Sequence, residues 1–283
     1  MELTAAEIRT AIQAALTEDI GPGDVTTLAT VPAASRARAV LRAREPLVVA
    51  GLAFAETAFR ELAPEMQFTP GRRDGEHLGP GETLMEFQGA ARAMLTAERV
   101  ALNFVQRLSG VATATAAYVA AVAGTNVRIL DTRKTTPGWR RFEKYAVACG
   151  GGTNHRTGLY DLVLIKDNHL AALRDALPNA IAAAVQRARA HAPQLQVEVE
   201  ADTLAQVAQA ADAGADIILL DNMTPAQLTE AVQIIAGRAR TEASGGVNLQ
   251  TVRAIAATGV DFISVGAITH SARAVDIGLD FEG

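Results

Sequence analysis

The stretch QVEVEADTLAQVAQAADAGADIILLDN, residues 196–222, decides the fold class. It contains an alternating strand-like run, an alanine-rich helical segment that ends at Gly214, and a second apolar strand-like run. A strand, a helix and a strand in this order predict a βαβ unit, whose two strands run parallel.

The same unit recurs through the second half of the chain. Strand-like runs are predicted at 127–132, 161–167, 196–201, 216–222, 241–247 and 261–267. Helical stretches separate them, near 140–149, 171–192, 203–213, 225–236 and 249–258. Since a closed barrel needs about eight such units, the sequence predicts an open, incomplete α/β barrel, with a doubly wound sheet as the alternative.

The first 110 residues have a different pattern. A helical opening reaches about Leu16, and a turn-rich loop, IGPGDVTT, is expected at 20–27. Further elements are expected as a strand at 36–51, a helix that includes 56–62, short strands separated by prolines and glycines within 64–90, and a helix at 96–123. This mixture predicts a small N-terminal α/β sandwich domain.

Composition narrows the class of protein. Of 283 residues, 49% are hydrophobic and the net charge is −5, which argues against global disorder and against a chain-wide nucleic-acid or membrane-surface coat. One cysteine, Cys149, allows no intramolecular disulfide. The acidic opening and the short apolar run at 47–55 fit neither a signal peptide nor a membrane span. We therefore expect a cytoplasmic globular protein that contacts neither membrane nor nucleic acid.

Polar residues follow all six predicted strands, where the carboxyl ends of parallel strands meet at one edge. In chain order they are Asp131 to Lys134, Lys166 to His169, Glu198 with Glu200, Asp221 with Asn222, Ser244 to Gly246, and Gly266 with Ala267 leading to His270. Six strand ends with candidate chemistry predict one shared site.

Charge within that set indicates the ligand. Between Arg133 and His169 there are seven Lys or Arg against three Asp or Glu, in a chain of net charge −5. Arginine suits carboxylates and lysine suits phosphates, so a small, multiply anionic ligand is predicted. A solvated helix face is the alternative for the basic residues at 140–144. It fits Lys166 poorly, because Lys166 directly follows the apolar run LVLI.

Three further groups have both a functional and a structural interpretation. Glu198 and Glu200 share one strand face, where either can form a structural salt bridge with a cation, whereas Glu200 and Asp221, one βα unit apart, can hold Mg²⁺ or sugar hydroxyls. Ser244-Gly245-Gly246, followed by a helix, resembles a phosphate cradle, but an ordinary turn has the same composition. The loop 150–156, GGGTNHR, brings His155 and Arg156 to a ligand, or is a flexible linker.

The run DTRKTTPGWRRFEKYAVACGGGTNHRTGLYDLVLIKDNH at 131–169 strongly resembles the quinolinate phosphoribosyltransferase family. Further matching segments, in family order, are NFVQRLSGVAT (103–113), VEVE (197–200), LLDNM (219–223), EASGGVNL (242–249) and SVGAITHSA (264–272).

The resemblance implies an N-terminal α/β sandwich domain at 1–111, to which a C-terminal tail at 271–283 returns, and an open barrel catalytic domain at 112–270. It also implies a homodimer, or a dimer-based homo-oligomer, with shared active sites. The implied reaction joins quinolinate to phosphoribosyl pyrophosphate with Mg²⁺, and gives nicotinate mononucleotide, pyrophosphate and CO2 in NAD biosynthesis.

The resemblance also assigns roles to individual residues. The quinolinate dicarboxylate would be held by Arg133, His155, Arg156 and Lys166, with Thr132 nearby and Arg107 from the other subunit. Lys134 would lie near the anionic groups of the sugar donor, and Glu200 and Asp221 would hold the ribose hydroxyls and Mg²⁺. The 5′-phosphate would lie against Ser244, Gly245, Gly246, Gly266, Ala267 and His270. The implied catalytic residues are Glu200, Asp221, Lys134 and Lys166.

Two other functions can be distinguished from this one by experiment. A Schiff-base aldolase would use Lys166 as its nucleophile, and borohydride would trap the adduct. A catalytically silent sensor of phosphate ligands would bind without turnover. A relative of the family that is found with molybdate transport would be expected to differ within the TRK and NHR segments, which are intact here.

Overall fold

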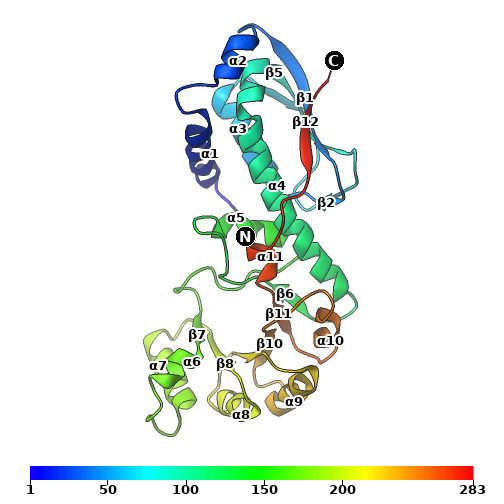
Figure 1. Cartoon of the computed structure of the whole chain (residues 1–283). Coiled ribbons are helices and arrows are strands. Elements are labelled where there is room, and N and C mark those ends of the chain that lie inside the picture. Colours follow the sequence, from blue (N-terminus) through cyan, green and yellow to red (C-terminus); the bar gives the residue numbers. More distant parts are fainter. Residues whose placement is uncertain (70, 283) are drawn as a thin grey trace. The chain divides into compact units, whose positions relative to one another are not determined.

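The computed structural model describes residues 1–69 and 71–282, and Figure 1 colours it along the sequence. The chain divides into two compact units. Unit 1 contains residues 1–116, 141–151 and 271–283, and unit 2 contains residues 117–140 and 152–270. Pro70, one of the predicted turn residues, lies outside the described residues.

Unit 1 is built on an antiparallel sheet with the strand order β12-β1-β5-β3. Its strands are β1 (Arg36–Ala43), β3 (Gln67–Thr69), β5 (Thr83–Ala90) and β12 (Ile277–Glu282). A separate short ladder pairs β2 (Leu47–Val48) with β4 (His77–Leu78). The predicted strand at 36–51 is therefore two strands, and the last strand of the chain pairs with β1.

The helices of unit 1 supply most of its core. They are α1 (Ala5–Ile20), α2 (Val25–Thr30), α3 (Leu52–Leu62), α4 (Ala91–Ala121) and α5 (Arg140–Cys149), of which the end of α4 and the first residue of α5 fall in unit 2. Fully buried Phe59 packs on Phe87 of β5 with ring centroids 4.4 Å apart. This contact joins α3 to the sheet.

One prediction for unit 1 is wrong. The segment 20–27 was expected to be a loop, but α2 begins at Val25. The carboxylate of Asp24 accepts a hydrogen bond from the backbone N–H of Thr27 at 2.9 Å, which caps the first turn of the helix. The N-cap interaction overrides the turn composition of the preceding glycines.

Unit 2 contains six parallel strands in the order β6-β11-β10-β9-β8-β7. They are β6 (Arg128–Leu130), β7 (Val163–Ile165), β8 (Val197–Ala201), β9 (Ile217–Asp221), β10 (Arg240–Ser244) and β11 (Phe262–Ser264). The first strand pairs with the last, while β6 and β7 are not neighbours. This order is that of a barrel left open at one seam, as predicted, and excludes the doubly wound sheet.

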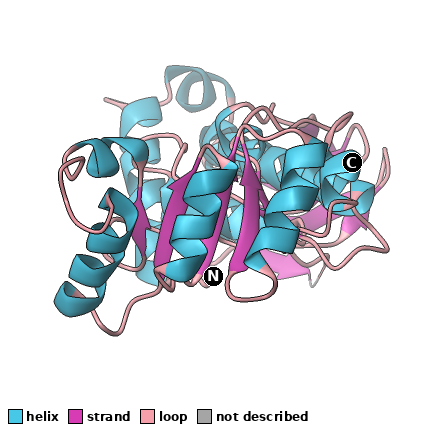
Figure 2. Ribbon diagram, turned by 90° about the horizontal axis from the view of Figure 1, so that it is seen from below, coloured by secondary structure: helices cyan, strands magenta, loops and turns pink. Residues whose placement is uncertain are grey.

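Helices connect these strands, and Figure 2 shows helices lying along the parallel strands. They are α6 (Asp167–Ala171), α7 (Ala180–His191), α8 (Leu204–Asp212), α9 (Pro225–Ile235), α10 (Val252–Ala256) and α11 (Ala267–His270). Among the described residues, no helix is both long enough and apolar enough to cross a membrane.

Two predicted helices of unit 2 are shorter than expected. The stretch 171–192 contains α7 only from Ala180, because Pro178 interrupts it and Asn179 caps the new helix. The stretch 249–258 contains α10 only from Val252 to Ala256. The Ser244-Gly245-Gly246 turn is therefore not followed at once by a helix. A helix dipole does not support the predicted phosphate site at this turn.

Candidate active site

The carboxyl ends of the barrel strands surround a cavity of about 570 Å³ in unit 2. It is lined by Thr132, Arg133, Lys134, His155, Arg156, Leu164, Lys166, Glu200, Leu219, Asp221, Asn222, Glu242, Ser244, Gly245, Gly246 and Ser264. Every β-strand of the barrel, or the loop after it, contributes to this set. The structure thus brings most of the predicted site residues into one cavity.

The loop that carries His155 and Arg156 lies beside β6, the strand at the open seam of the barrel. Thr153 forms a parallel bridge with Leu130, and its N–H donates to the carbonyl of Ile129 at 2.8 Å. Buried Asp131 accepts from the backbone N–H of His155 at 2.8 Å and from Nδ2 of Asn154 at 2.7 Å. These bonds anchor the loop, so the interpretation as a flexible linker is wrong.

Two arginines form the cationic side of the cavity. Nε of Arg133 and Nε of Arg156 are both buried without a hydrogen-bond partner. Burial lowers the pKa of Arg156, and the nearby charge of Arg133 lowers it further, while Glu198 and Asp161 act in the opposite direction. Two neighbouring guanidinium groups with unused N–H donors are suited to a ligand that brings negative oxygen atoms.

The acidic side of the cavity lies across β8 and β9. Carboxylate oxygens of Glu200, Asp202 and Asp221 lie within 4.8 Å of one another. Nζ of Lys166 is 2.6 Å from Oε2 of Glu200, and Nδ2 of Asn222 donates to Asp221. The predicted carboxylate pair of Glu200 and Asp221 is therefore part of a group of three, called the acidic trio below. Its third member, the exposed Asp202, was not predicted.

Backbone conformation shapes the end of β10. Gly245 and Gly246 have φ values of +95° and +60°. A β-carbon on Gly245 would lie 2.2 Å from Oδ1 of Asn222, whereas one on Gly246 would meet nothing within 4 Å. Both glycines are exposed and line the cavity, so a ligand can approach their backbone without meeting a side chain, as a phosphate cradle requires.

The other predicted phosphate residues lie beside Lys134. A β-carbon on Gly266 would lie 3.1 Å from both Nε2 of His270 and Cδ of Lys134. The hydroxyl of Thr269 donates to the carbonyl of Lys134 at 2.8 Å, which ties α11 to the loop after β6. Gly266, Ala267 and His270 do not line the cavity. Gly266 lies next to Lys134, and Lys134 does line the cavity.

Arg107 is the predicted site residue that belongs to unit 1. Its Nη2 donates to Oε1 of buried Glu143 at 2.6 Å, and its Nη1 donates to the carbonyl of Ala272. Arg107 is not among the residues that line the cavity of unit 2.

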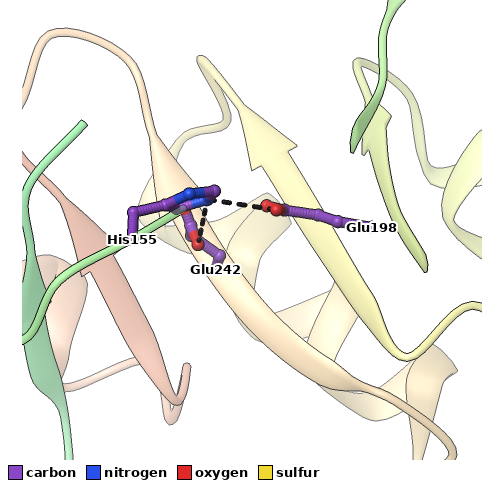
Figure 3. A group of neighbouring side chains, drawn as sticks. All are labelled: His155, Glu198 and Glu242. Carbon is purple, nitrogen blue, oxygen red and sulfur yellow. Dashed lines mark ion pairs between the residues drawn. The ribbon is translucent and has the colours of Figure 1, made fainter. Parts of the chain in front are cut away.

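A buried group of three side chains, His155, Glu198 and Glu242, adjoins the cavity (Figure 3). Nε2 of His155 lies 3.0 Å from Oε2 of Glu198 and 3.5 Å from Oε2 of Glu242. Glu242 was missed as a site residue, although the alternation of a strand could have found it. It stands two residues before Ser244 on β10, as Glu198 stands two before Glu200 on β8, so each shares a face with a cavity residue.

An open parallel barrel with arginines, carboxylates and a glycine turn at its carboxyl edge defines an enzyme that binds a small polyanion beside a phosphate group. Comparison with family models gives the particular family. The model described as "Quinolinate phosphoribosyl transferase, C-terminal domain" matches residues 111–280, and that of the N-terminal domain matches residues 24–109. The chain belongs to the quinolinate phosphoribosyltransferase family.

Individual relatives agree over nearly the whole chain. The "Nicotinate-nucleotide pyrophosphorylase [carboxylating]" of Mycobacterium leprae is 46% identical over 96% of this chain and 96% of its own length. The "Quinolinate phosphoribosyltransferase [decarboxylating] 1" of Nicotiana glauca is 42% identical over 98% of this chain and 83% of its own. The nicotinate-nucleotide pyrophosphorylase structure from Francisella tularensis has a TM-score of 0.93 and 38% identity, and covers 99% of this chain and 98% of that one.

Proposed function

We propose that this chain transfers the phosphoribosyl group of phosphoribosyl pyrophosphate to quinolinate with loss of CO2. The products are nicotinate mononucleotide, pyrophosphate and CO2, and the reaction belongs to NAD biosynthesis. Membership of the family and the names of full-length relatives support the reaction.

The observation that carries the proposal is the pair of buried Nε–H groups of Arg133 and Arg156, which have no protein acceptor and belong to residues that line one cavity. An unpaired buried donor costs about 1–3 kcal/mol, which a carboxylate ligand recovers with a charge-assisted hydrogen bond. With Lys166 they supply three positive charges for a ligand with two carboxylates. His155 and Thr132 line the same cavity and complete the proposed quinolinate site.

The sugar donor is proposed to lie between the acidic trio and the turn after β10. The donor set of Glu200, Asp202 and Asp221 consists only of carboxylate oxygens, which fits Mg²⁺. Glu200 and Asp221 would hold the ion, which when bound neutralises negative charge on the pyrophosphate group. Lys134 and the backbone of Gly245 and Gly246 would hold the remaining phosphate oxygens.

The residues of the cavity act by orientation and electrostatics. Arg133, Arg156 and Lys166 hold the dicarboxylate so that its ring nitrogen faces the sugar. Glu200 and Asp221 stabilise the positive charge that develops on the ribose as pyrophosphate leaves. Lys134 stabilises the leaving phosphates.

Decarboxylation follows from the bond that has just formed. When the ring nitrogen bonds to the sugar it becomes positively charged, and it stabilises the electron pair that remains on the adjacent ring carbon as CO2 departs. That carbon then takes up a proton. No covalent intermediate with the protein is needed, and the ion pair of Lys166 with Glu200 suits an anion site better than a Schiff base.

A homodimer is part of the proposal, in which Arg107 of one subunit joins the cavity of the other. The resemblance to the family supports it, as does the need of a dicarboxylate site for cations. Cytoplasmic location is likewise proposed, because phosphorylated sugar donors carry several charges and do not cross membranes unaided.

The direct test is formation of nicotinate mononucleotide from purified protein, quinolinate, phosphoribosyl pyrophosphate and Mg²⁺, followed by chromatography, with released CO2 measured in parallel. We expect product and CO2 in equal amounts, and none when EDTA replaces Mg²⁺. Failure to form the mononucleotide would refute the proposal. Borohydride treatment with a carbonyl substrate should leave Lys166 unmodified, and a trapped adduct would favour an aldolase.

A further inference from the structure

His155, Glu198 and Glu242 form a buried group whose chemistry the proposed reaction leaves unused. Both carboxyl groups are shielded from solvent, with residue exposures of 0% for Glu198 and 1% for Glu242. They come from β8 and β10, on either side of β9, and point at the same imidazole (Figure 3). The group adjoins the proposed dicarboxylate site, since His155 and Glu242 line the cavity.

Hydrogen bonds assign the protonation state of the imidazole. Nδ1 of His155 accepts from the backbone N–H of Arg156 at 2.7 Å, so this nitrogen carries no hydrogen. The ring is then the neutral tautomer with its hydrogen on Nε2, the atom that faces both carboxyl groups. A neutral ring supplies one N–H and no positive charge.

Two carboxylates cannot both be ionised in these surroundings. Burial penalises each charge, and two like charges on either side of one neutral ring repel each other in a medium of low dielectric constant. Of the two carboxyl groups, Glu242 lies farther from Nε2, at 3.5 Å against 3.0 Å for Glu198. Glu242 is then the carboxyl group that keeps its proton.

We propose that Glu242 is a positioning residue that works as a neutral carboxylic acid, and that together with Glu198 it clamps His155 and thereby fixes Arg156 for binding of the dicarboxylate. This inference rests on the proposed function, because it concerns how that site holds quinolinate. The clamp acts through the ring, since His155 is held at Nε2 by the carboxyl groups and at Nδ1 by the main chain of Arg156.

The groups that face Glu242 agree with this assignment. Burial, and next to it the charge of Glu198, raise the pKa of Glu242 to about 8, and Asp131 contributes in the same direction. The hydroxyl of Ser264 opposes the rise, and a protonated His155 would do so as well. On the neighbouring strand β9, Leu219 pairs with Glu242 and offers no charge.

A neutral Glu242 gives the proposed site a dependence on pH. Below about pH 8 Glu242 is neutral and adds no negative charge to the lining of the cavity. As pH rises through that value Glu242 ionises and adds a negative charge to a cavity whose proposed ligand is itself a dianion. Binding of quinolinate should therefore weaken with increasing pH, whereas binding of the sugar donor should not follow the same curve.

The experiment measures the Kd of quinolinate by isothermal titration calorimetry on the full chain from pH 6.5 to 9.5, with KM for both substrates in parallel. The variants are E242A, E242Q and E198Q, with E230Q on the exposed surface of α9 as the matched control. Wild type and E230Q should lose up to about tenfold in quinolinate affinity per pH unit above 8.

E242A should weaken quinolinate binding at pH 7 by about tenfold or more, because it leaves a cavity and frees the ring. E242Q should restore most of that loss, since an amide copies a neutral carboxylic acid, and its affinity should no longer fall above pH 8. E198Q should weaken quinolinate binding, because an amide then replaces the carboxyl group in the shorter contact with Nε2. Circular dichroism and thermal melting on each variant separate loss of fold from loss of binding.

The proposal is overturned if E242Q binds quinolinate as weakly as E242A, or if its pH profile follows that of wild type. Elemental analysis that finds a stoichiometric metal ion in wild type, absent from E242Q, would also overturn it, since the three side chains would then be ligands. Failure of the proposed function gives a different result from failure of the role of Glu242. In that case the wild-type protein would show no quinolinate binding at any pH.

Discussion

Gly245 offers a sharp test of the turn at the end of β10. A β-carbon at this position would lie 2.2 Å from Oδ1 of Asn222 and 2.9 Å from its backbone nitrogen. That nitrogen donates to the carbonyl of Ser244 at 2.9 Å, and Asp221 of the acidic trio precedes it directly. Gly245→Ala must therefore displace main chain as well as a side chain, at the point where β9 and β10 form the cavity.

The cost has two parts. The φ of +95° at Gly245 costs alanine about 1–2 kcal/mol, and the displacement of neighbouring backbone adds about 1–3 kcal/mol. A total of about 3 kcal/mol lowers the Tm of a chain of this size by about 6–12 °C. Because the same displacement disturbs the proposed phosphate cradle, KM for phosphoribosyl pyrophosphate should rise by about tenfold or more.

Gly237→Ala is the matched control. Gly237 has a φ of +76° in the turn after α9, but a β-carbon there would meet nothing within 4 Å. It should cost about 1 kcal/mol from backbone strain alone and leave both KM values unchanged. The assays are thermal melting by fluorimetry and steady-state kinetics. Equal melting temperatures and equal KM values for the two alanine variants would refute the reasoning.

Further predictions address the rest of the site and the fold. Arg156→Ala should weaken quinolinate binding by about 100-fold, as loss of a buried charge-assisted bond pair costs about 3 kcal/mol, with little change in the KM of the sugar donor; equal effects on both substrates, by calorimetry and kinetics, would contradict the assigned role. Asp221→Asn should raise the Mg²⁺ concentration that gives half-maximal activity and lower kcat by about 100-fold, and an unchanged Mg²⁺ titration would remove Asp221 from the metal site. In a dimer with shared sites, equal mixing of inactive Arg107→Ala and Arg156→Ala chains after refolding should restore about a quarter of the wild-type activity, whereas sites confined to one chain should restore none. Hydrogen bonds from Arg273, and then from the Asp276 N–H, lower the pKa of Glu45 to about 2, so its contribution to stability is complete above about pH 4.5 and is lost as pH falls toward 2; Glu45→Gln should flatten acid unfolding in that range, as circular dichroism would show.

The sequence predicts the barrel well because its signals are local. All six strands of unit 2 occur where apolar or alternating runs indicated them. Gly214 has a φ value of +76°, which agrees with its prediction as the end of a helix. The pairing of β6 with β11, by contrast, joins segments far apart in the chain, and the βαβ repeat alone left the doubly wound sheet open as an alternative.

The errors have physical reasons of two kinds. Helix boundaries failed where one side chain decides them, as Asp24 does at α2 and Pro178 does before α7. At the site, Asp202 and Glu242 were missed although each stands two residues from a predicted site residue, Glu200 and Ser244 respectively, so that the alternation of a strand could have found both. The roles of the site residues and the domain boundaries at 111 and 270 stay predictions.

The open seam of the barrel has a consequence for how such a site can change. Arg156 comes from a loop that lies beside β6 and is tethered by Asp131, whereas the acidic trio and the glycine turn come from strands β8 to β10 and their ends. In the proposed function this loop supplies His155 and Arg156 to the acid, and the strand ends supply the groups for the sugar donor. On that proposal, a different loop between Thr153 and β7 would alter which aromatic acid is accepted, while the strand ends keep the site for the common donor.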